Sequence, residues 1–389
     1  GIGRVAREIR PDGSFGPIYF VRYNRHSGWN ESNTNYPFYT EADDPGFIEA
    51  CEALLEDKLV TMQWWEEEKN PDGHYPVSGY QAFNWYKRKD GAIVGLWKHA
   101  KASLSWDEGQ TWQPVEHIPS IITSGGKIWG EETSDGRYAI IYNPSPEGNH
   151  RWPLALSVSE DGKDFDKLLV VNGDIPPRRY YGAHKNYGHS YMRGFEAGDG
   201  RPNGNLWIAY SANKEDLFVS EIPVPIRDTV DEHVRDTFDQ LETGGTVPNW
   251  NIYSLQWAPV AVTDYPSATD KSLMLADRDP TDYAKAMRVF PERAKIRVRF
   301  RVSAAQTTQG ELHVEIQDKK GAAPVRLLIE GGRWKVLQKG DWVPVASCEA
   351  GRWYDVTIEV DAPVQRFNLS IGDEYSKRLV FTAPAFTVE

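Results

Sequence analysis

Basic side chains, histidines and tyrosines gather in short polar segments of this sequence, between stretches of alternating hydrophobicity. The segments are residues 24–26, 64–68, 98–99, 124–127, 149–151, 178–181 and 213–216, with His184, Lys185, Tyr187 and His189 close behind 178–181. Together with the strand that follows, they supply the candidate ligand-binding residues Arg25, Trp65, Lys127, Arg151, Arg178, Arg179, Tyr181, Arg193 and Lys214. Because guanidinium groups bind a carboxylate or sulfate through paired hydrogen bonds, this set predicts a site for an anionic ligand.

The same part of the chain contains groups that could move a proton. Histidine, glutamate and tyrosine are the usual general acids and bases of enzymes. The candidates for this role are His26, Glu66, Glu67, His150 and Tyr191.

Each of these residues also has a purely structural interpretation. A loop arginine is usually solvated or ion-paired, a single loop histidine usually makes a hydrogen bond, and the run 66–68 could be a solvated acidic stretch. The recurrence of basic or histidine residues in equivalent segments favours a shared site over these separate roles.

Length and charge limit the possible classes of protein. The chain has 389 residues, of which 40% are hydrophobic and 26% charged, which is typical of a folded protein with about two domains. A net charge of −12 argues against a nucleic-acid surface. No stretch approaches the roughly 20 apolar residues of a membrane-spanning helix, so we expect neither nucleic acid nor membrane as a partner.

The sequence predicts no cofactor and no metal. Its two cysteines, Cys51 and Cys348, are too few and too far apart for a disulfide framework or a cysteine zinc site. No phosphate-binding glycine loop is present, and the acidic stretch 277–282 resembles a polar turn more than a calcium loop.

The aromatic content is high, with 15 tryptophans and 19 tyrosines. Aromatic rings pack between sheets in β-rich folds, and they also stack on the apolar faces of sugars. We expect packing to account for most of them and leave the remainder as candidates for a carbohydrate site.

A repeat of short strands positions these residues. The stretches 79–90, 92–98, 102–106 and 113–118 read as four consecutive strands, and the pattern recurs at 127–134, 137–142, 153–159 and 167–171. A third unit has strands at 190–196, 205–211 and 217–223 but no fourth. Units of roughly 45–50 residues fit the four-stranded blades of a β-propeller.

An earlier unit begins with strands at 1–10 and 18–23 and is interrupted by a helix at about 44–58, where Pro45 occupies the first turn. Four units are therefore recognisable. Because the first and last blades of a propeller must meet, we expect further blades N-terminal to Gly1 or on a separate piece.

The character of the chain changes after Pro225. Residues 226–243 are charged and resemble a linker, and evenly spaced alternating strands fill residues 244–389. This spacing predicts an antiparallel β-sandwich of the jelly-roll type.

One motif stands in the turn between the third and fourth strands of a unit. It reads Ser105-Trp106-Asp107-Glu108-Gly109-Gln110-Thr111-Trp112, and a shortened relative occupies 159–165. The aspartate can accept backbone N–H groups in a tight turn, the glycine permits positive φ, and the tryptophan can pack between sheets.

These residues resemble the Asp-box (BNR) repeat of sialidase-like β-propellers from bacterial glycan-degrading proteins, over about residues 1–225. The tail resembles the lectin-like sandwiches often attached to them. The resemblance implies an all-β fold, with a propeller of six blades when complete, and a secreted or periplasmic enzyme for which a carbohydrate is the partner. It assigns the Asp boxes a structural role. The motif that carries the first arginine and the acid of sialidases is not found in this sequence.

Two mechanisms and one non-catalytic role fit the resemblance. An exo-acting glycosidase for an acidic glycan would use Tyr191 with Glu66 or Glu67, while Arg178 and Arg193 hold the acid group. A polysaccharide lyase would use His26, His150, Tyr191 and Arg151 on a uronate. A glycan-binding protein would use the same loops without turnover. The blade geometry predicts that these loops share the face opposite the Asp boxes, and we favour hydrolysis.

Overall fold

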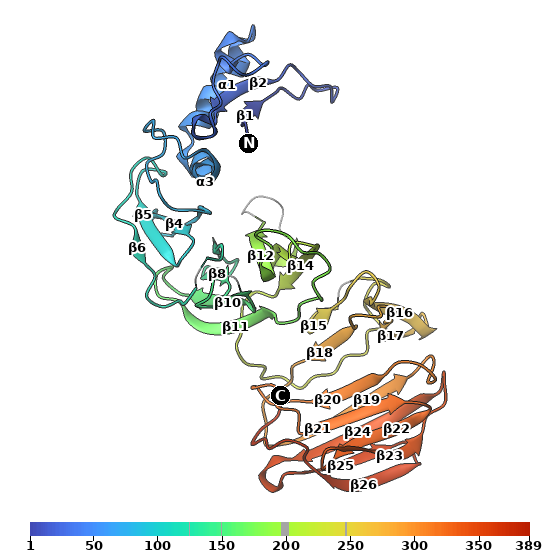
Figure 1. Ribbon diagram of the computed structural model, residues 1–389. Coiled ribbons are helices and arrows are strands. Elements are labelled where there is room, and N and C mark those ends of the chain that lie inside the picture. Colours follow the sequence, from blue (N-terminus) through green and yellow to red (C-terminus); the bar gives the residue numbers. More distant parts are fainter. Residues whose placement is uncertain (124, 149, 196–201, 246) are drawn as a thin grey trace. The chain divides into compact units, whose positions relative to one another are not determined.

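The computed structural model describes residues 1–389 except 124, 149, 196–201 and 246. Ser124, Asn149 and Glu196, which belong to predicted loops and strands, lie outside the described residues. The chain divides into two compact units, which are Gly1–Asp228 with Pro280–Asp282, and Thr229–Asp279 with Tyr283–Glu389. Strands predominate in both units (Figure 1).

Three four-stranded sheets follow one another in the first unit. The first has the order β3 (Asn84–Lys87), β4 (Ile93–Trp97), β5 (Lys101–Ser105) and β6 (Glu116–His117). The second contains β7 (Trp129–Glu132), β8 (Tyr138–Tyr142), β10 (Leu154–Ser159) and β11 (Asp166–Asn172). The third contains β12 (Tyr187–Gly194), β13 (Leu206–Ala212) and β14 (Asp216–Ile222). These are the repeats that the strand pattern predicts.

The fourth strand of the third sheet has a different origin from the others. The short strand β9 (His150–Arg151), which precedes β10 in the chain, pairs in parallel with the start of β12 through Tyr187–His150 and Gly188–Arg151. β9 lies beside β12, and within the described residues no strand pairs with the outer edge of β14. This agrees with the prediction that the third unit lacks an outer strand.

Neighbouring sheets of the first unit pack face to face through apolar side chains. Tyr86 and Leu96 of the first sheet meet Ile140 of the second in one buried cluster. Another cluster joins Ile141 of the second sheet to Met192 and other apolar residues of the third. These contacts fix the ends of the sheets, which position the functional loops.

Close packing leaves no room for a side chain at Gly130, in β7. A Cβ atom there would lie 2.8 Å from Leu96 Cδ1 and 2.8 Å from Tyr86 Cδ1. Gly130→Ala should therefore destabilise the first unit by about 1–3 kcal/mol, which urea unfolding followed by tryptophan fluorescence would measure. Gly173→Ala is the control, since its Cβ would meet only Val170 Cγ1 at 3.6 Å. Equal stability of the two variants would contradict the prediction.

The N-terminal segment pairs β1 (Gly3–Ala6) with β2 (Tyr19–Tyr23) and then forms helices. The predicted helix is confirmed as α1 (Pro45–Glu56), which begins where the Asp44 carboxylate accepts the N–H of Gly46. Residues 58–68 continue as α2 (Lys58–Thr61), η3 (Met62–Trp64) and α3 (Trp65–Glu68). The expected polar connection at 64–68 is therefore helical.

Further 3₁₀ turns are η1 (Arg25–Ser27), η2 (Tyr39–Glu41), η4 (Pro202–Gly204) and η5 (Ala362–Val364).

The Asp107 turn has the geometry that its residue pattern predicts. The Asp107 carboxylate accepts the N–H of Thr111 at 2.8 Å, its hydroxyl at 2.6 Å and the Ser105 hydroxyl at 2.9 Å, and Gly109 has φ +83°. In the shorter relative, Asp161 accepts the N–H groups of Lys163 and Asp164. Both carboxylates are occupied in closing their turns.

The second unit contains two four-stranded sheets with a common core. One has the order β19 (Lys295–Ser303), β24 (Trp353–Asp361), β25 (Arg366–Ile371) and β26 (Tyr375–Val380). The other has the order β20 (Leu312–Ile316), β21 (Val325–Glu330), β22 (Arg333–Gln338) and β23 (Asp341–Ser347). Trp334 of one sheet and Phe367 and Ile358 of the other share the buried core, so the two sheets form a sandwich.

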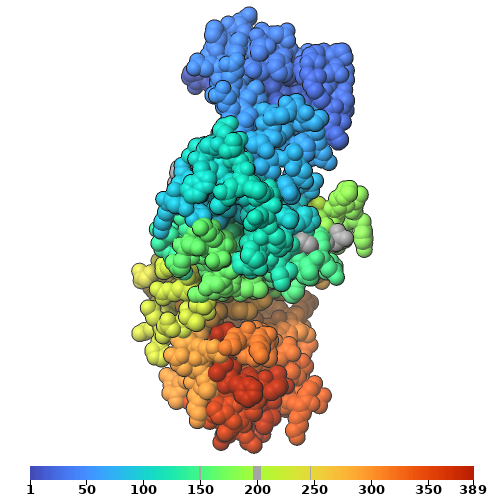
Figure 2. Space-filling view, turned by 90° about the vertical axis from the view of Figure 1, so that its left-hand side faces the viewer, coloured from blue at the N-terminus to red at the C-terminus, as the bar shows by residue number. Residues whose placement is uncertain are grey.

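Two small sheets precede this sandwich in the chain. They pair β15 (Trp250–Tyr253) with β18 (Lys285–Arg288) and β16 (Val260–Ser267) with β17 (Asp270–Leu275). In the space-filling view the residues of the sandwich, coloured orange to red, form one continuous body (Figure 2). Residues 226–243, the predicted linker, contain no helix or strand. The predicted jelly-roll connectivity and the number of blades stay predictions.

Candidate functional site

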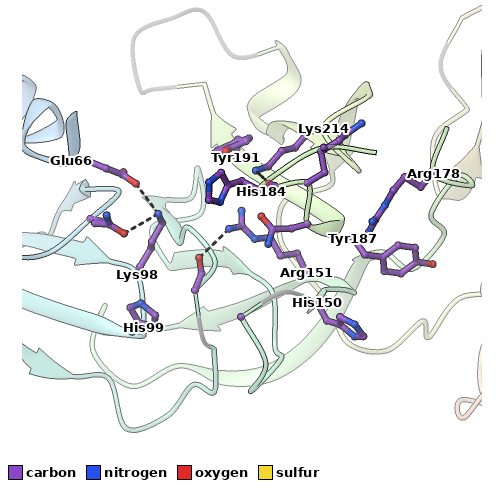
Figure 3. A pocket seen from close by; sticks show the side chains of 16 residues that line it. Glu66, Lys98, His99, His150, Arg151, Arg178, His184, Tyr187, Tyr191 and Lys214 are labelled. Carbon is purple, nitrogen blue, oxygen red and sulfur yellow. Dashed lines mark hydrogen bonds and ion pairs between the residues drawn. The ribbon is translucent and has the colours of Figure 1, made fainter. Parts of the chain in front are cut away.

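A cavity of about 740 Å³ lies in the first unit, where loops from its three sheets meet α3. Six of the fourteen candidate residues line it, namely Glu66, His150, Arg151, Arg178, Tyr191 and Lys214. Lys98, His99, His184, Lys185 and Tyr187, from the same polar segments, line it as well. The cavity thus collects cations and histidines from separate loops (Figure 3).

Glu66 is the only carboxylate among the described residues that line the cavity. Its Oε1 receives an ion pair from Lys98 Nζ at 2.8 Å, and its Oε2 accepts the N–H of Ala82 at 3.0 Å. Lys98 also donates to the Gln81 side chain at 3.3 Å. These contacts hold the carboxylate at one side of the cavity (Figure 3).

Arg151 is a buried cation, and no carboxylate of the described residues forms an ion pair with it. It is 9% exposed, and its guanidinium donates to the Ser190 hydroxyl at 3.2 Å and to the Gly125 carbonyl oxygen at 3.3 Å. Its Nε is buried and has no hydrogen-bond acceptor in the described part of the chain. Burial lowers the pKa of Arg151, and electrostatic interactions with Tyr191 and Glu66 oppose that shift. A buried cation has lost part of its hydration, and without a counter-ion no ion pair compensates for that loss. Binding of an anionic ligand beside it is therefore favourable.

The backbone of Arg151 is fixed by its pairing with β12. Gly188 has φ +97°, and a Cβ atom at this position would lie 2.3 Å from the Arg151 carbonyl oxygen. Only glycine therefore fits at residue 188 without moving Arg151.

Tyr191 has an unusual backbone conformation within a strand. Its φ is +58°, and the register between β12 and β13 shifts between Ser190 and Arg193, which is the mark of a bulge. Two cations lie against its ring, with Arg151 Cζ 5.9 Å and Lys214 Nζ 5.2 Å from the ring centroid. Strained backbone at a bulge that turns a side chain into a cavity is typical of functional sites.

Lys127 and Arg193 do not line the cavity, and both lie against the ring of Trp129. Lys127 Nζ lies 5.6 Å and Arg193 Cζ 5.8 Å from the centroid of the Trp129 ring. Burial and the neighbouring Arg193 lower the pKa of Lys127, while Glu66 opposes the shift. Both candidates therefore add positive charge to the surroundings of the cavity.

The loop before β12 is held by a buried carboxylate, Glu215, whose side chain is 1% exposed. It accepts the N–H groups of Arg179 and Tyr180, each at 2.9 Å, and the Lys185 ammonium at 2.5 Å. Burial alone would raise the pKa of Glu215, but these donors outweigh it and lower the pKa to about 2. The candidate Arg179 thus serves to anchor the loop and does not line the cavity.

Glu215→Gln should loosen this loop. The variant loses the ion pair with Lys185, a contribution on the order of 2 kcal/mol, so amide exchange over residues 178–187 should rise at least about tenfold at pH 7. Because the folded pKa is depressed, the contribution of Glu215 is present above about pH 4.5 and is lost as the pH falls towards 2. The difference between variant and parent should therefore shrink at pH 3. The control is Glu160→Gln, since the Glu160 side chain is exposed, and similar exchange in both variants would contradict the anchoring role.

The remaining candidates lie elsewhere in the first unit. Arg25 pairs with Glu31 at 2.6 Å, and Glu67 pairs with Arg4 at 2.8 Å. His26, Trp65 and Tyr181 do not line the cavity either. His26 donates its backbone N–H to the Asn70 side chain, and Trp65 packs edge-on against Tyr75. Tyr181 is 94% exposed.

The prediction that every unit sends its loop to one mouth is therefore wrong for residues 24–26. That loop closes on local partners, and the N-terminal segment reaches the cavity through Glu66 of α3 instead. Glu215 was not among the candidates, because in the sequence it is only one acid within the polar stretch 213–216.

Two further features bear on the class of site. Metal-binding side chains do not gather at one point within the described ranges: three or more histidine, cysteine, aspartate or glutamate residues are nowhere placed so that they could hold a metal ion. No helix in the described part of the chain is long and apolar enough to cross a membrane.

Comparisons with known proteins found matches for the N-terminal and the C-terminal parts of the chain. A family model described as a BT_1020-like N-terminal beta propeller matches residues 1–80, and one described as a sialidase-like CBM domain matches residues 250–389. A solved structure named a sialidase is 41% identical with a TM-score of 0.90, and the match covers 100% of this chain and 35% of that one. The resemblance to sialidase-like β-propellers with a C-terminal sandwich is confirmed.

Other solved structures are much less similar. Trypanosoma rangeli sialidase is 11% identical at a TM-score of 0.24, over 80% of this chain and 59% of its own. A mutant of the GH43 protein BlXynB from Bacillus licheniformis is 11% identical at a TM-score of 0.30, over 79% of this chain and 66% of its own. No curated protein matches the chain significantly.

Proposed function

We propose that this chain, which is related to the sialidase-like β-propeller proteins, provides the active-site cavity of an exo-acting glycoside hydrolase for acidic glycans. The chain spans about a third of the length of the sialidase that it matches, so the proposal concerns the cavity described above. One observation carries the proposal: the buried Arg151 guanidinium lines a carbohydrate-sized cavity and forms no ion pair with a carboxylate of the described residues.

The charges of the cavity support an acidic substrate. Lys98, Arg151, Arg178, Lys185 and Lys214 line it, against the single carboxylate of Glu66. Lys98 and Lys185 have carboxylate partners, whereas Arg151 and Arg178 have no ion pair in the described part of the chain. Lining arginines without an ion pair suit the carboxylate of a sialic or uronic acid.

Tyr191 and Glu66 are the groups that we assign to the chemistry. A tyrosine–carboxylate pair can flank a glycosidic bond, with one partner attacking or activating and the other transferring the proton of the leaving oxygen. Both line the cavity, and Arg151 and Lys214 beside the Tyr191 ring would stabilise negative charge that develops there. Glu67, the alternative partner, is paired with Arg4 and is not assigned a role.

A polysaccharide lyase is the second candidate, because His150 and His184 line the same cavity as Arg151 and Tyr191. In that reaction an arginine neutralises the uronate carboxylate while a histidine or tyrosine removes the C5 proton. His26, which a lyase was expected to use, does not line the cavity.

Digestion of a panel of sialylated and uronate-containing glycans, with mass analysis of the products, tests the proposal. A hydrolase releases a terminal acidic sugar, and the summed mass of its two products exceeds the mass of the substrate by one water. A lyase releases an unsaturated uronate that absorbs in the ultraviolet, and this product would overturn hydrolysis. Binding without any product would overturn both enzymatic roles and leave a glycan-binding protein.

A further inference from the structure

The cavity of the first unit extends beyond the groups to which the proposed chemistry is assigned. Figure 3 shows Glu66 at one side of it and Arg178 with Tyr187 at the other, with Tyr191 between them. Tyr187 and Tyr191 are four residues apart in β12, which corresponds to up to about 13 Å of strand. A volume of about 740 Å³ also lies in the range of sites that hold drug-sized ligands. The cavity is therefore longer and larger than one sugar unit requires.

Three side chains form the far end of the cavity, which we call the outer subsite: His150, Arg178 and Tyr187. The pairing of β9 with β12 sets His150 beside Tyr187, and the centroids of their rings are 6.3 Å apart. Arg178 Cζ lies 6.0 Å from the centroid of the Tyr187 ring. Tyr187 is 41% exposed. A guanidinium and an imidazole thus adjoin one accessible aromatic ring.

The main chain that carries Arg178 is held in place directly after this residue. The backbone N–H groups of Arg179 and Tyr180 both donate to the buried Glu215 carboxylate at 2.9 Å. The outer subsite therefore has a fixed loop on one side and the strand pairing of β9 with β12 on the other.

The positive charge of Arg178 is not neutralised by the described residues. Its guanidinium lies near the Tyr187 ring and forms no ion pair with a described carboxylate. Glu66, the only carboxylate among the described residues that line the cavity, is paired with Lys98 at 2.8 Å on the other side. Arg151 and Arg178 adjoin different tyrosine rings, so they offer two separate positions for negative charge.

We propose that the outer subsite binds a second acidic sugar unit, namely the unit to which the released terminal sugar is linked. The inference rests on the proposed function, which places bond cleavage at Tyr191 and Glu66. The Arg178 guanidinium binds the carboxylate of the second unit, the Tyr187 ring packs against the apolar face of the sugar, and His150 exchanges a hydrogen bond with a hydroxyl. A neutral second unit leaves Arg178 without a partner, so the substrate class is a glycan with two adjacent acidic units.

Titration calorimetry of the full chain with two pairs of sugars tests the outer subsite. The pairs are galacturonic acid with digalacturonic acid, and sialic acid with disialic acid. The measurements use the Tyr191→Phe background, which keeps the ring but removes the hydroxyl assigned to the chemistry, so that the sugars are not consumed. In at least one pair the dimer should bind about tenfold more tightly than the monomer, because it adds a charge pair.

The ratio of the monomer Kd to the dimer Kd is the quantity that reports on the outer subsite. Arg178→Met should lower this ratio at least about fivefold, and Tyr187→Ala should lower it in the same direction. Arg227→Met is the matched control, because Arg227 is exposed and does not line the cavity, and it should keep the ratio of the parent. Sialyllactose is the control ligand, since its second sugar carries no carboxylate, and it should bind more weakly than disialic acid.

The outcomes separate the outer subsite from the proposed function. Dimers that bind no more tightly than monomers, or a ratio that Arg178→Met leaves intact or Arg227→Met lowers equally, would overturn the outer subsite. Arg151→Met should weaken monomers and dimers alike. If it weakens neither while the ratio still depends on Arg178, the proposed function is wrong and the outer subsite alone is supported. Absence of binding by all of these sugars would overturn both.

Discussion

Turnover of an acidic glycan should fall by a factor of about 100 to 10,000 when Tyr191 is replaced by phenylalanine, and by a similar factor in Glu66→Gln. Both variants remove a group to which the proposed mechanism assigns a role at the reacting atoms, and both leave the shape of the cavity almost unchanged. The loss should therefore appear in kcat, with little change in KM, in steady-state release of the acidic sugar.

Glu67→Gln is the matched control for Glu66→Gln. The two residues are neighbours in α3, but Glu67 pairs with Arg4 outside the cavity. It should keep at least half of the parent activity. If Glu67→Gln loses as much activity as Glu66→Gln, or if Tyr191→Phe keeps normal kcat, the assignment of the reacting groups is wrong.

The second large effect concerns Arg151. Arg151→Met should raise KM, or the Kd of an acidic monosaccharide, by about 10- to 100-fold, because a hydrogen-bonded charge pair contributes roughly 1.5–3 kcal/mol. The Kd of an uncharged sugar should not change. Isothermal titration with both sugars at fixed ionic strength measures the two effects side by side.

Two comparisons separate recognition by Arg151 from a loss of folding. Arg151→Lys keeps the charge but not the planar fork, so it should recover part of the affinity. Arg25→Met removes a cation that is paired with Glu31 and does not line the cavity, so it should bind as the parent does. Equal weakening of charged and uncharged sugars in Arg151→Met would indicate a structural role only.

Much of this fold could be predicted from local patterns. The alternation of apolar residues gave the strands of the first unit and of the sandwich, and Asp44 with Pro45 marked the start of α1. The Asp107 turn could be anticipated because its hydrogen bonds join residues only a few positions apart. Each of these features depends on short-range chemistry that the sequence displays directly.

The candidate site could be predicted only in part, because partner choice is a long-range property. Arg25 and Arg151 both read as loop cations, yet one pairs with Glu31 while the other is buried beside Ser190. Nothing in the spacing separates these outcomes. The anchoring by Glu215 likewise joins residues 30 or more positions apart, and the sequence has no local pattern for it.

The contact between Gly188 and the Arg151 carbonyl limits how such a cavity could be redesigned. Since the main chain at residues 150–151 and 187–188 is already at its closest spacing, an insertion in either stretch would displace the guanidinium from its place. Selection for a new substrate should therefore yield exchanges at Lys98, Arg178 or Lys214, whereas length variation should accumulate in segments such as 28–36 that do not line the cavity. A mutant library of this chain should therefore vary Lys98, Arg178 and Lys214 and keep Gly188 unchanged.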